Sequence, residues 1–218
     1  MPDELEAVLF DMDGLLVDTE PLWFETEAEV MTRLGNDSWS AADQEQLLGG
    51  SMANTVGYLL SKATKPATPE AVARWMMDGM LARAAEGRVT VRPGARELLT
   101  QVADAGIPHA LVTGSQRRFA DAVMASTGLR FTVTVCGDDV TRPKPDPEPY
   151  QLAAKLLDAA PERCVALEDS PNGVTSATAA GCLVVAVPSL VSIPQAPRRL
   201  VVPSLKDLTL TSLRALAA

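Results

Sequence analysis

Carboxylate and hydroxyl side chains directly follow three short apolar runs of the sequence, at 7–10, 110–112 and 165–167. They are Asp11, Asp13, Thr113, Glu168 and Asp169, and a loop beyond a fourth apolar run adds Lys144. In an open α/β sheet, ligands bind at the edge where the parallel strands have their carboxyl ends. If the apolar runs are such strands, these side chains converge on one edge of the sheet.

The acids of this predicted cluster would repel one another without a counter-charge. At an effective dielectric constant of 20, two like charges 4 Å apart cost on the order of 4 kcal/mol. A divalent cation relieves this repulsion, and a site of carboxylate and carbonyl oxygens favours Mg²⁺ over zinc. The sequence therefore predicts Mg²⁺ among Asp11, Asp13, Glu168 and Asp169.

A phosphate group fits the same edge. Lys144 and the Thr113 hydroxyl would bind it, and Asp11 could attack it to form an aspartyl phosphate, a known role of carboxylates. Side chains two residues apart in an extended segment lie on the same side, so Asp13 would face the group that Asp11 faces. A protonated Asp13 could donate to the leaving oxygen and later accept a proton from water.

Each of these features also has an ordinary structural interpretation. Asp13 precedes a glycine, and Asp-Gly is a common turn pair. Acids such as Glu168 and Asp169 are favoured at a helix N-terminus without any metal. Lys144, flanked by prolines, could be a solvated surface lysine. Their joint occurrence after successive apolar runs favours the catalytic interpretation.

The apolar runs predict the elements that position these residues. The runs at 7–10, 110–112, 133–135, 165–167 and 183–187 are apolar throughout, as in parallel strands covered by helices on both faces. Helical patterns lie between them, at 94–105 and 119–127, and two more begin near Pro147 and Pro171. The fold class is therefore α/β, a Rossmann-like doubly wound parallel sheet, with a last strand and helix in the tail from Val201 to Ala218.

The segment 16–87 interrupts this alternation with helical patterns and no convincing strand. Four helices are expected there: one ending near Gly35, one from a capping box at Ser40 to Gly49-Gly50, one capped by Ser51 and one beginning at Thr68. We predict a four-helix cap domain at 16–87 and an α/β core at 1–15 and 88–218. Trp23, Met52 and Trp75 are expected to pack inside the cap, and Lys62 and Lys65 to be solvated.

Composition narrows the class of protein. The 218 residues are 47% hydrophobic and 22% charged, enough for one or two hydrophobic cores. With 19 Lys and Arg against 28 Asp and Glu, the formal charge is −9, which disfavours binding to nucleic acid or to an anionic membrane. No apolar run approaches the roughly 20 residues of a membrane span.

Cysteine and histidine usage narrows the class of protein further. Cys136, Cys164 and Cys182 lie beside apolar runs and are expected to be buried free thiols in a reducing compartment. The N-terminal segment 1–4 lacks a signal-peptide pattern, so the predicted location is the cytoplasm. The single histidine, His109, excludes a His-rich zinc site and is expected to be structural. Nothing in the composition requires a partner, so a monomer or weak homo-oligomer is expected.

The ordered motifs resemble those of the haloacid dehalogenase superfamily, in the branch with a helical cap after the first motif. The resemblance covers essentially the whole chain, from Asp-Met-Asp-Gly-Leu-Leu-Val-Asp-Thr-Glu at 11–20, through Leu-Val-Thr-Gly-Ser at 111–115 and Lys-Pro at 144–145, to Glu-Asp-Ser-Pro-Asn-Gly at 168–173. Dehalogenases of the superfamily lack the second aspartate, so Asp13 indicates a phosphotransferase instead.

The resemblance implies a role for each matching residue. Asp11 would be the nucleophile and Asp13 the general acid and base, while Thr113 and Lys144 would hold the phosphoryl group. Mg²⁺ would be held by Asp11, the Asp13 backbone carbonyl, Glu168 and Asp169, directly or through water.

Within this branch, the chain is most similar to sugar-phosphate and hexitol-phosphate phosphatases and to β-phosphoglucomutase. Trp23 and Met52 stand where family mutases carry a cap histidine and a cap arginine, which disfavours a mutase. We therefore predict a Mg²⁺-dependent phosphatase acting on a small phosphorylated metabolite of the sugar-phosphate or sugar-alcohol-phosphate class. A phosphomutase and a non-catalytic phosphate-binding module stay open as alternatives.

Overall fold

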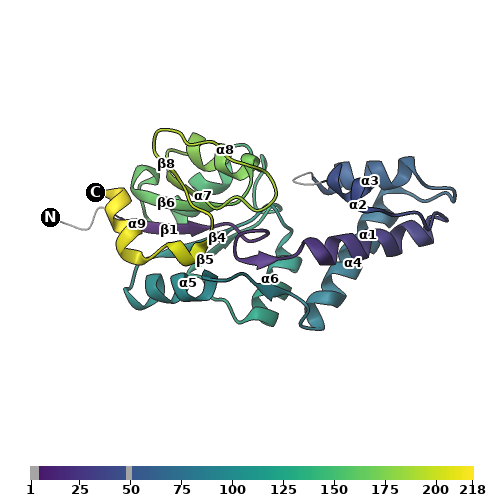
Figure 1. Ribbon diagram of the computed structural model, residues 1–218, viewed down its shortest axis with the longest axis horizontal. Coiled ribbons are helices and arrows are strands. Elements are labelled where there is room, and N and C mark those ends of the chain that lie inside the picture. The colour runs from purple at the N-terminus through teal and green to yellow at the C-terminus, as the bar shows by residue number, and fades with distance from the viewer. Residues whose placement is uncertain (1–4, 48–50) are drawn as a thin grey trace. The chain divides into compact units, whose positions relative to one another are not determined.

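The computed structural model describes residues 5–47 and 51–218, which divide into two compact units (Figure 1). The α/β unit comprises Met1–Asp18 and Thr90–Ala218, and the helical unit comprises Thr19–Val89. The units thus divide after residues 18 and 89, whereas the sequence prediction placed the divisions after residues 15 and 87.

A six-stranded parallel sheet forms the centre of the α/β unit, in the order β5-β4-β1-β6-β7-β8. The strands are β1 (Ala7–Phe10), β4 (His109–Val112), β5 (Val133–Val135), β6 (Cys164–Glu168), β7 (Leu183–Ala186) and β8 (Arg199–Val201). Each predicted apolar run forms a strand of this sheet, and the last strand, β8, ends at Val201, where it was expected to begin. The predicted fold class is therefore confirmed.

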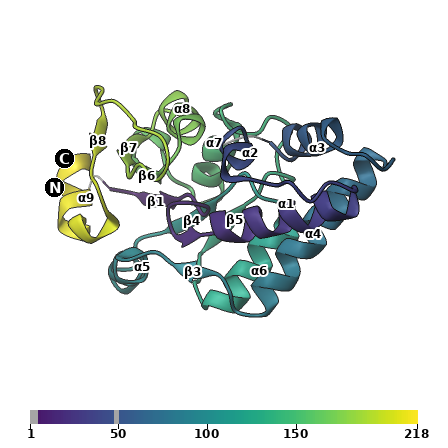
Figure 2. The same ribbon diagram turned by 45° about the vertical axis from the view of Figure 1, so that its right-hand side comes forward.

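Helices cover both faces of this sheet (Figure 2). They are α5 (Ala95–Asp104), α6 (Arg117–Thr127), α7 (Glu148–Leu156), α8 (Pro171–Ala179) and α9 (Leu210–Ala217), with short 3₁₀ helices at Pro161–Arg163 and Leu205–Asp207. Side chains alternate between the faces of a strand, so Ala7 and Leu9 of β1 pack with Ala153 of α7 and Ala177 of α8 in one core cluster. All of these are fully buried.

One sequence expectation for 16–87 is wrong, because a short strand lies there. β2 (Val17–Asp18) pairs antiparallel with β3 (Thr90–Val91) in a separate two-stranded sheet of the α/β unit. Two-residue strands leave no hydrophobic period in the sequence, since their pairing depends on segments that meet only in the folded chain.

The helical unit contains α1 (Glu20–Arg33), α2 (Ala41–Glu45), α3 (Met52–Ser61) and α4 (Pro69–Ala85). Ser40, Ser51 and Thr68 cap α2, α3 and α4 as predicted, and Ser40 forms the expected capping box with Asp43. The helix expected to run to Gly49-Gly50 ends earlier, at Glu45, and those two glycines lie outside the described residues.

The core of the helical unit is aliphatic and methionine-rich. Its buried members are Val30, Met31, Leu34, Val56, Leu59, Val72 and Met76, with Trp23, Trp39, Met52 and Trp75 packed partly buried against them. The expected interior packing of Trp23, Met52 and Trp75 is therefore present.

The remaining composition-based expectations concern isolated residues. Cys136, Cys164 and Cys182 are buried and free, and the pKa of each thiol is raised by burial to about 12. His109 is buried with Nδ1 2.9 Å from the Ile107 carbonyl oxygen, as a structural role requires.

Among the helices in the described part of the chain, none is long and apolar enough to cross a membrane.

Candidate active site

The carboxyl ends of three adjacent strands are joined by one lysine. Lys144 Nζ lies 2.6 Å from Asp11 Oδ1 beyond β1, 2.6 Å from Glu168 Oε1 at the end of β6 and 2.8 Å from the Val112 carbonyl oxygen at the end of β4. Its side chain is only 9% exposed. The solvated surface position considered for Lys144 is therefore wrong, and a charged group lies at the sheet edge where ligands are expected.

Carboxylates outnumber this lysine. Asp11, Glu168 and Asp169 are all buried, and each offers a carboxylate oxygen that lies within 4.8 Å of the others. Lys144 forms ion pairs with Asp11 and Glu168, which leaves the group with excess negative charge at the end of the sheet. Hard carboxylate oxygens at this spacing fit a divalent cation such as Mg²⁺.

The pKa values of the cluster reflect burial and crowding. Burial raises the pKa of Asp11 well above its ordinary value, against the lowering effect of Lys144, and Glu168 and Asp169 raise it further. Burial and the neighbouring Glu168 also raise the pKa of Asp169 to about 7. Burial opposes the charge of Lys144, but the two carboxylates that contact it raise its pKa above the ordinary value. A cation bound among these acids would favour their ionised forms.

Glu168 is fully buried, and its environment fixes its carboxylate. Oε1 accepts from Lys144 Nζ and from the Tyr150 hydroxyl at 2.5 Å. Burial, followed by the charge of Glu168, raises the pKa of Tyr150 well above its usual range, so the phenol stays protonated and donates. A Cβ placed on Gly173, in the first turn of α8, would lie 1.9 Å from Glu168 Oε1. The glycine therefore leaves the space that the carboxylate occupies.

Asp169 is enclosed in a similar way. Its Oδ2 accepts from the Ser189 hydroxyl, in the loop after β7, at 2.5 Å. Gly14 has φ +83°, in the left-handed region, and a Cβ there would lie 2.0 Å from the same oxygen. The turn after Asp13 therefore requires glycine both for its backbone conformation and for the approach of Asp169.

The Asp13 side chain accepts hydrogen bonds from hydroxyl groups rather than from Lys144, although its charge acts on Asp11 and Asp169. Its Oδ2 accepts from Ser115 Oγ at 2.8 Å and from Thr113 Oγ1 at 3.3 Å. Thr113 Oγ1 also accepts the Ser115 backbone N–H at 3.0 Å, so the loop after β4 orients both hydroxyls. Asp13 is partly exposed, whereas Asp11 is buried. The two aspartates that the sequence placed together thus have different surroundings.

All of the sequence-predicted site residues lie at this end of the sheet in the α/β unit. The contacts of Tyr150, Ser189, Ser115 and Gly173 with them were not predicted. Ser115 and Gly173 belong to the quoted motifs 111–115 and 168–173, which were the available signals. Tyr150 and Ser189 lie 18 and 20 residues from the carboxylates they contact, and no sequence spacing indicates those pairs.

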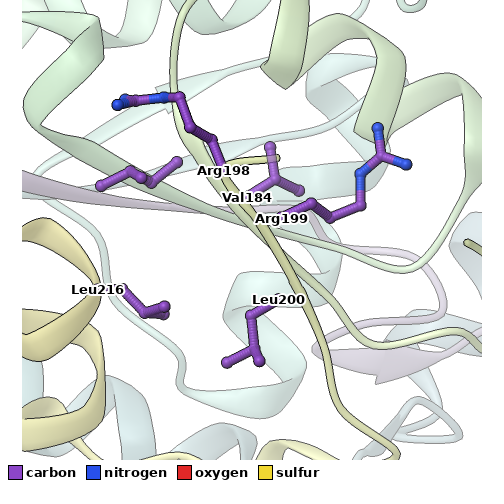
Figure 3. Close-up of a pocket in the computed structure, with 6 residues that line it drawn as sticks. Val184, Arg198, Arg199, Leu200 and Leu216 are labelled. Carbon is purple, nitrogen blue, oxygen red and sulfur yellow. The ribbon is translucent and has the colours of Figure 1, made fainter. Parts of the chain in front are cut away.

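A separate cavity lies at β7 and β8, with a volume of about 380 Å³. Its lining consists of Leu183, Val184, Arg198, Arg199, Leu200 and Leu216. The guanidinium groups of Arg198 and Arg199 point away from each other (Figure 3). None of the predicted site residues lines this cavity, and its polar groups do not converge on one point as those of a ligand site do.

A parallel α/β sheet with an inserted helical unit and acids at its carboxyl edge defines a class of hydrolases and phosphotransferases. The family of haloacid dehalogenase-like hydrolases matches residues 8–187, and the chain belongs to this family.

Individual relatives match over nearly the whole chain. Hexitol phosphatase A of Escherichia coli is 36% identical over 212 residues, covering 94% of this chain and 94% of the relative. A phosphorylated carbohydrates phosphatase of Thermotoga maritima is 34% identical, covering 81% of this chain and 82% of the relative. The crystal structure of CbbY from Rhodobacter sphaeroides in complex with phosphate is 32% identical and superimposes with a TM-score of 0.86, covering 96% of this chain and 99% of that chain.

Proposed function

We propose that this protein is a Mg²⁺-dependent phosphatase that hydrolyses a small phosphomonoester, a sugar or sugar-alcohol phosphate, through an aspartyl-phosphate intermediate. The observation that carries the proposal is the contact of the buried Asp11 carboxylate with Lys144, 2.6 Å away, at the carboxyl end of β1. A nucleophile beside a fixed positive charge suits phosphoryl transfer, because the oxygens of the phosphoryl group are negatively charged while the group is transferred.

The first step forms a bond between an Asp11 oxygen and phosphorus and breaks the bond from phosphorus to the ester oxygen. Lys144 would bind the phosphoryl oxygens as the group moves, and Thr113 would bind it through its hydroxyl. Asp13 would give its proton to the departing oxygen, which leaves as an alcohol. The hydroxyls of Ser115 and Thr113 support this role because they hold the Asp13 carboxyl in place.

The second step hydrolyses the aspartyl phosphate. Asp13, now ionised, would accept a proton from water as the water attacks phosphorus, and Asp11 would be released with inorganic phosphate. Asp11, Glu168 and Asp169 would hold Mg²⁺ with the Asp13 backbone carbonyl. When bound, Mg²⁺ supplies positive charge that stabilises the phosphoryl oxygens.

Two observations support a phosphorylated sugar as substrate. The relatives described above act, by their names, on hexitol phosphates and phosphorylated carbohydrates. The net charge of −9 disfavours a nucleic acid as the phosphate donor. A phosphomutase is the second candidate, and Trp23 and Met52 count against it because neither side chain can replace a histidine or an arginine in binding phosphate. The sequence composition supports the further proposal of a cytoplasmic enzyme that is a monomer or weak homo-oligomer.

The test is release of inorganic phosphate from hexose 1- and 6-phosphates, hexitol phosphates, glycerol phosphates and nucleoside monophosphates, with Mg²⁺ and with EDTA. Asp11→Asn is compared with Asp104→Asn, the same change at an exposed position at the end of α5. We expect Mg²⁺-dependent release that Asp11→Asn abolishes and Asp104→Asn leaves unchanged. Normal turnover in folded Asp11→Asn would refute the mechanism. Turnover only of a sugar 1-phosphate with a bisphosphate activator, yielding an isomer, would establish the mutase.

A further inference from the structure

We propose that Tyr150 is a positioning residue of the active site, which holds the Glu168 carboxylate in the orientation that binds the cation. This inference rests on the proposed function and assigns a role to a side chain outside the sequence motifs. Tyr150 lies in the first turn of α7, is fully buried, and donates its hydroxyl to Glu168 Oε1 at 2.5 Å.

The geometry of Glu168 explains why a second donor matters. A carboxylate held by one donor on one oxygen can still rotate about its terminal bond, because that torsion is broad. Lys144 and Tyr150 reach Oε1 from two different elements, the loop before α7 and α7 itself. Within the described part of the chain, Oε2 accepts at longer range, at 3.3 Å from the Asp169 N–H and 3.4 Å from Ser170 Oγ. Two strong donors on Oε1 therefore fix the direction of the other oxygen.

Tyr150 also contacts the lysine. Lys144 Nζ lies 5.0 Å from the centroid of the Tyr150 ring, within the range of a cation–π interaction. The ring is packed in the core cluster with Val174 of α8 and Ala166 of β6. Because the ring is fixed by the core, its hydroxyl is held at one place beside both charged groups. Partners that orient metal ligands in this way typically contribute roughly 10- to 100-fold in metal affinity or activity.

The ring and the hydroxyl can be separated by substitution. Tyr150→Phe keeps the core packing and the ring face toward Lys144 and removes only the donor to Glu168. The chain has one other tyrosine, Tyr58 of the helical unit, whose hydroxyl donates to Asp43 Oδ1 at 3.0 Å. Tyr58→Phe is therefore a matched control: the same atom is removed, and a hydrogen bond to a carboxylate is again lost.

The experiment measures Mg²⁺ binding by calorimetry without substrate, and kcat and KM for the best phosphomonoester. We expect Tyr150→Phe to weaken Mg²⁺ binding and to lower kcat by about tenfold or more, with KM changing less, because the phenol does not touch the substrate. Tyr58→Phe should match the wild-type protein in both, and thermal unfolding in EDTA should show both variants folded.

The outcomes are distinguishable from those of the proposed function. Mg²⁺ affinity and kcat in Tyr150→Phe equal to those of the wild type, or tighter Mg²⁺ binding, would overturn the positioning role, because the ring would then be the only part that matters. Absence of phosphate release in the wild-type protein would instead overturn the proposed function.

Discussion

Both units of this protein bury carboxylates, but Asp43 of the helical unit and the acid cluster of the α/β unit differ in how their negative charge is compensated. In the helical unit, Asp43 accepts hydrogen bonds from Ser40, Tyr58 and Lys62, and these donors lower its pKa. Lys62, expected to be solvated, is thus part of this cluster.

In the α/β unit, three buried acids compete for one lysine, and the pKa values of Asp11 and Asp169 are raised. A carboxylate with enough donors stabilises the fold by itself, whereas a cluster with too few is completed by a ligand. Asp43 and the cluster of Asp11, Glu168 and Asp169 therefore differ in how far protein donors compensate their charge, and several such acids gathered at one sheet edge favour a functional site.

The largest effect is expected when the one lysine of the acid cluster is removed. Lys144→Met should lower kcat/KM by about 10²- to 10³-fold, because a charge that stabilises the phosphoryl oxygens is lost. It should also destabilise the protein in EDTA by about 3 kcal/mol or more, since buried carboxylates lose their counter-charge. Steady-state kinetics and denaturant unfolding measure the two effects.

Lys155→Met is the control, because Lys155 lies exposed on α7. It should leave both quantities near the wild-type values. An unchanged kcat/KM in Lys144→Met would remove this lysine from the site.

The second prediction compares two helical glycines, one in each unit. A Cβ at Gly173 would lie 1.9 Å from Glu168 Oε1, whereas a Cβ at Gly57 of α3 meets nothing within 4 Å. Gly173→Ala should therefore displace Glu168, weaken Mg²⁺ binding and destabilise the fold by about 1–3 kcal/mol. Gly57→Ala should stabilise it by about 1 kcal/mol, the propensity difference between the two residues. Thermal unfolding with and without Mg²⁺ checks both, and equal stability changes would contradict the close contact at Gly173.

The sequence predicted the sheet and the acids of the site because both depend on local signals. An apolar run such as 165–167 predicts a strand, and the end of that strand sets the position of the residues that follow it. Glu168 and Asp169 are therefore placed at the sheet edge by their neighbours in the chain. Lys144 was identified, but its contact with three strands depends on how its loop folds back.

The hydroxyl donors to Glu168 and Asp169 could not be predicted, because they lie far along the sequence from the acids that they contact. In the sequence, Tyr150 looks like any other core residue of a helix. Only the packing of α7 against the sheet brings its hydroxyl to Glu168. In the same way, β2 and β3 are defined by a pairing between residues 17–18 and 90–91, which no local pattern records.

The smallest effect is expected from Glu27, an acid of the helical unit that forms no ion pair with any of the residues the structure describes. Glu27 of α1 is 3% exposed, and burial, reinforced by Glu20, raises its pKa to about 7 from an ordinary 4.5. The folded state therefore holds a proton that the unfolded state releases above pH 4.5. Stability from this proton is complete below pH 4.5, is lost as pH rises toward 7, and changes no further above that.

Glu27→Gln should remove this dependence. Its melting temperature should fall less between pH 5 and pH 8 than that of the wild-type protein, because no proton is released at this position. Asp43→Asn is the matched control: the Asp43 pKa is lowered, so Asp43 is ionised in both states above pH 5 and its contribution is lost only in acid. That variant should melt lower at every pH from 5 to 8 with the wild-type slope. A Glu27→Gln profile parallel to wild type would show that Glu27 is ionised in the fold, and the contrast between the two acids would then disappear.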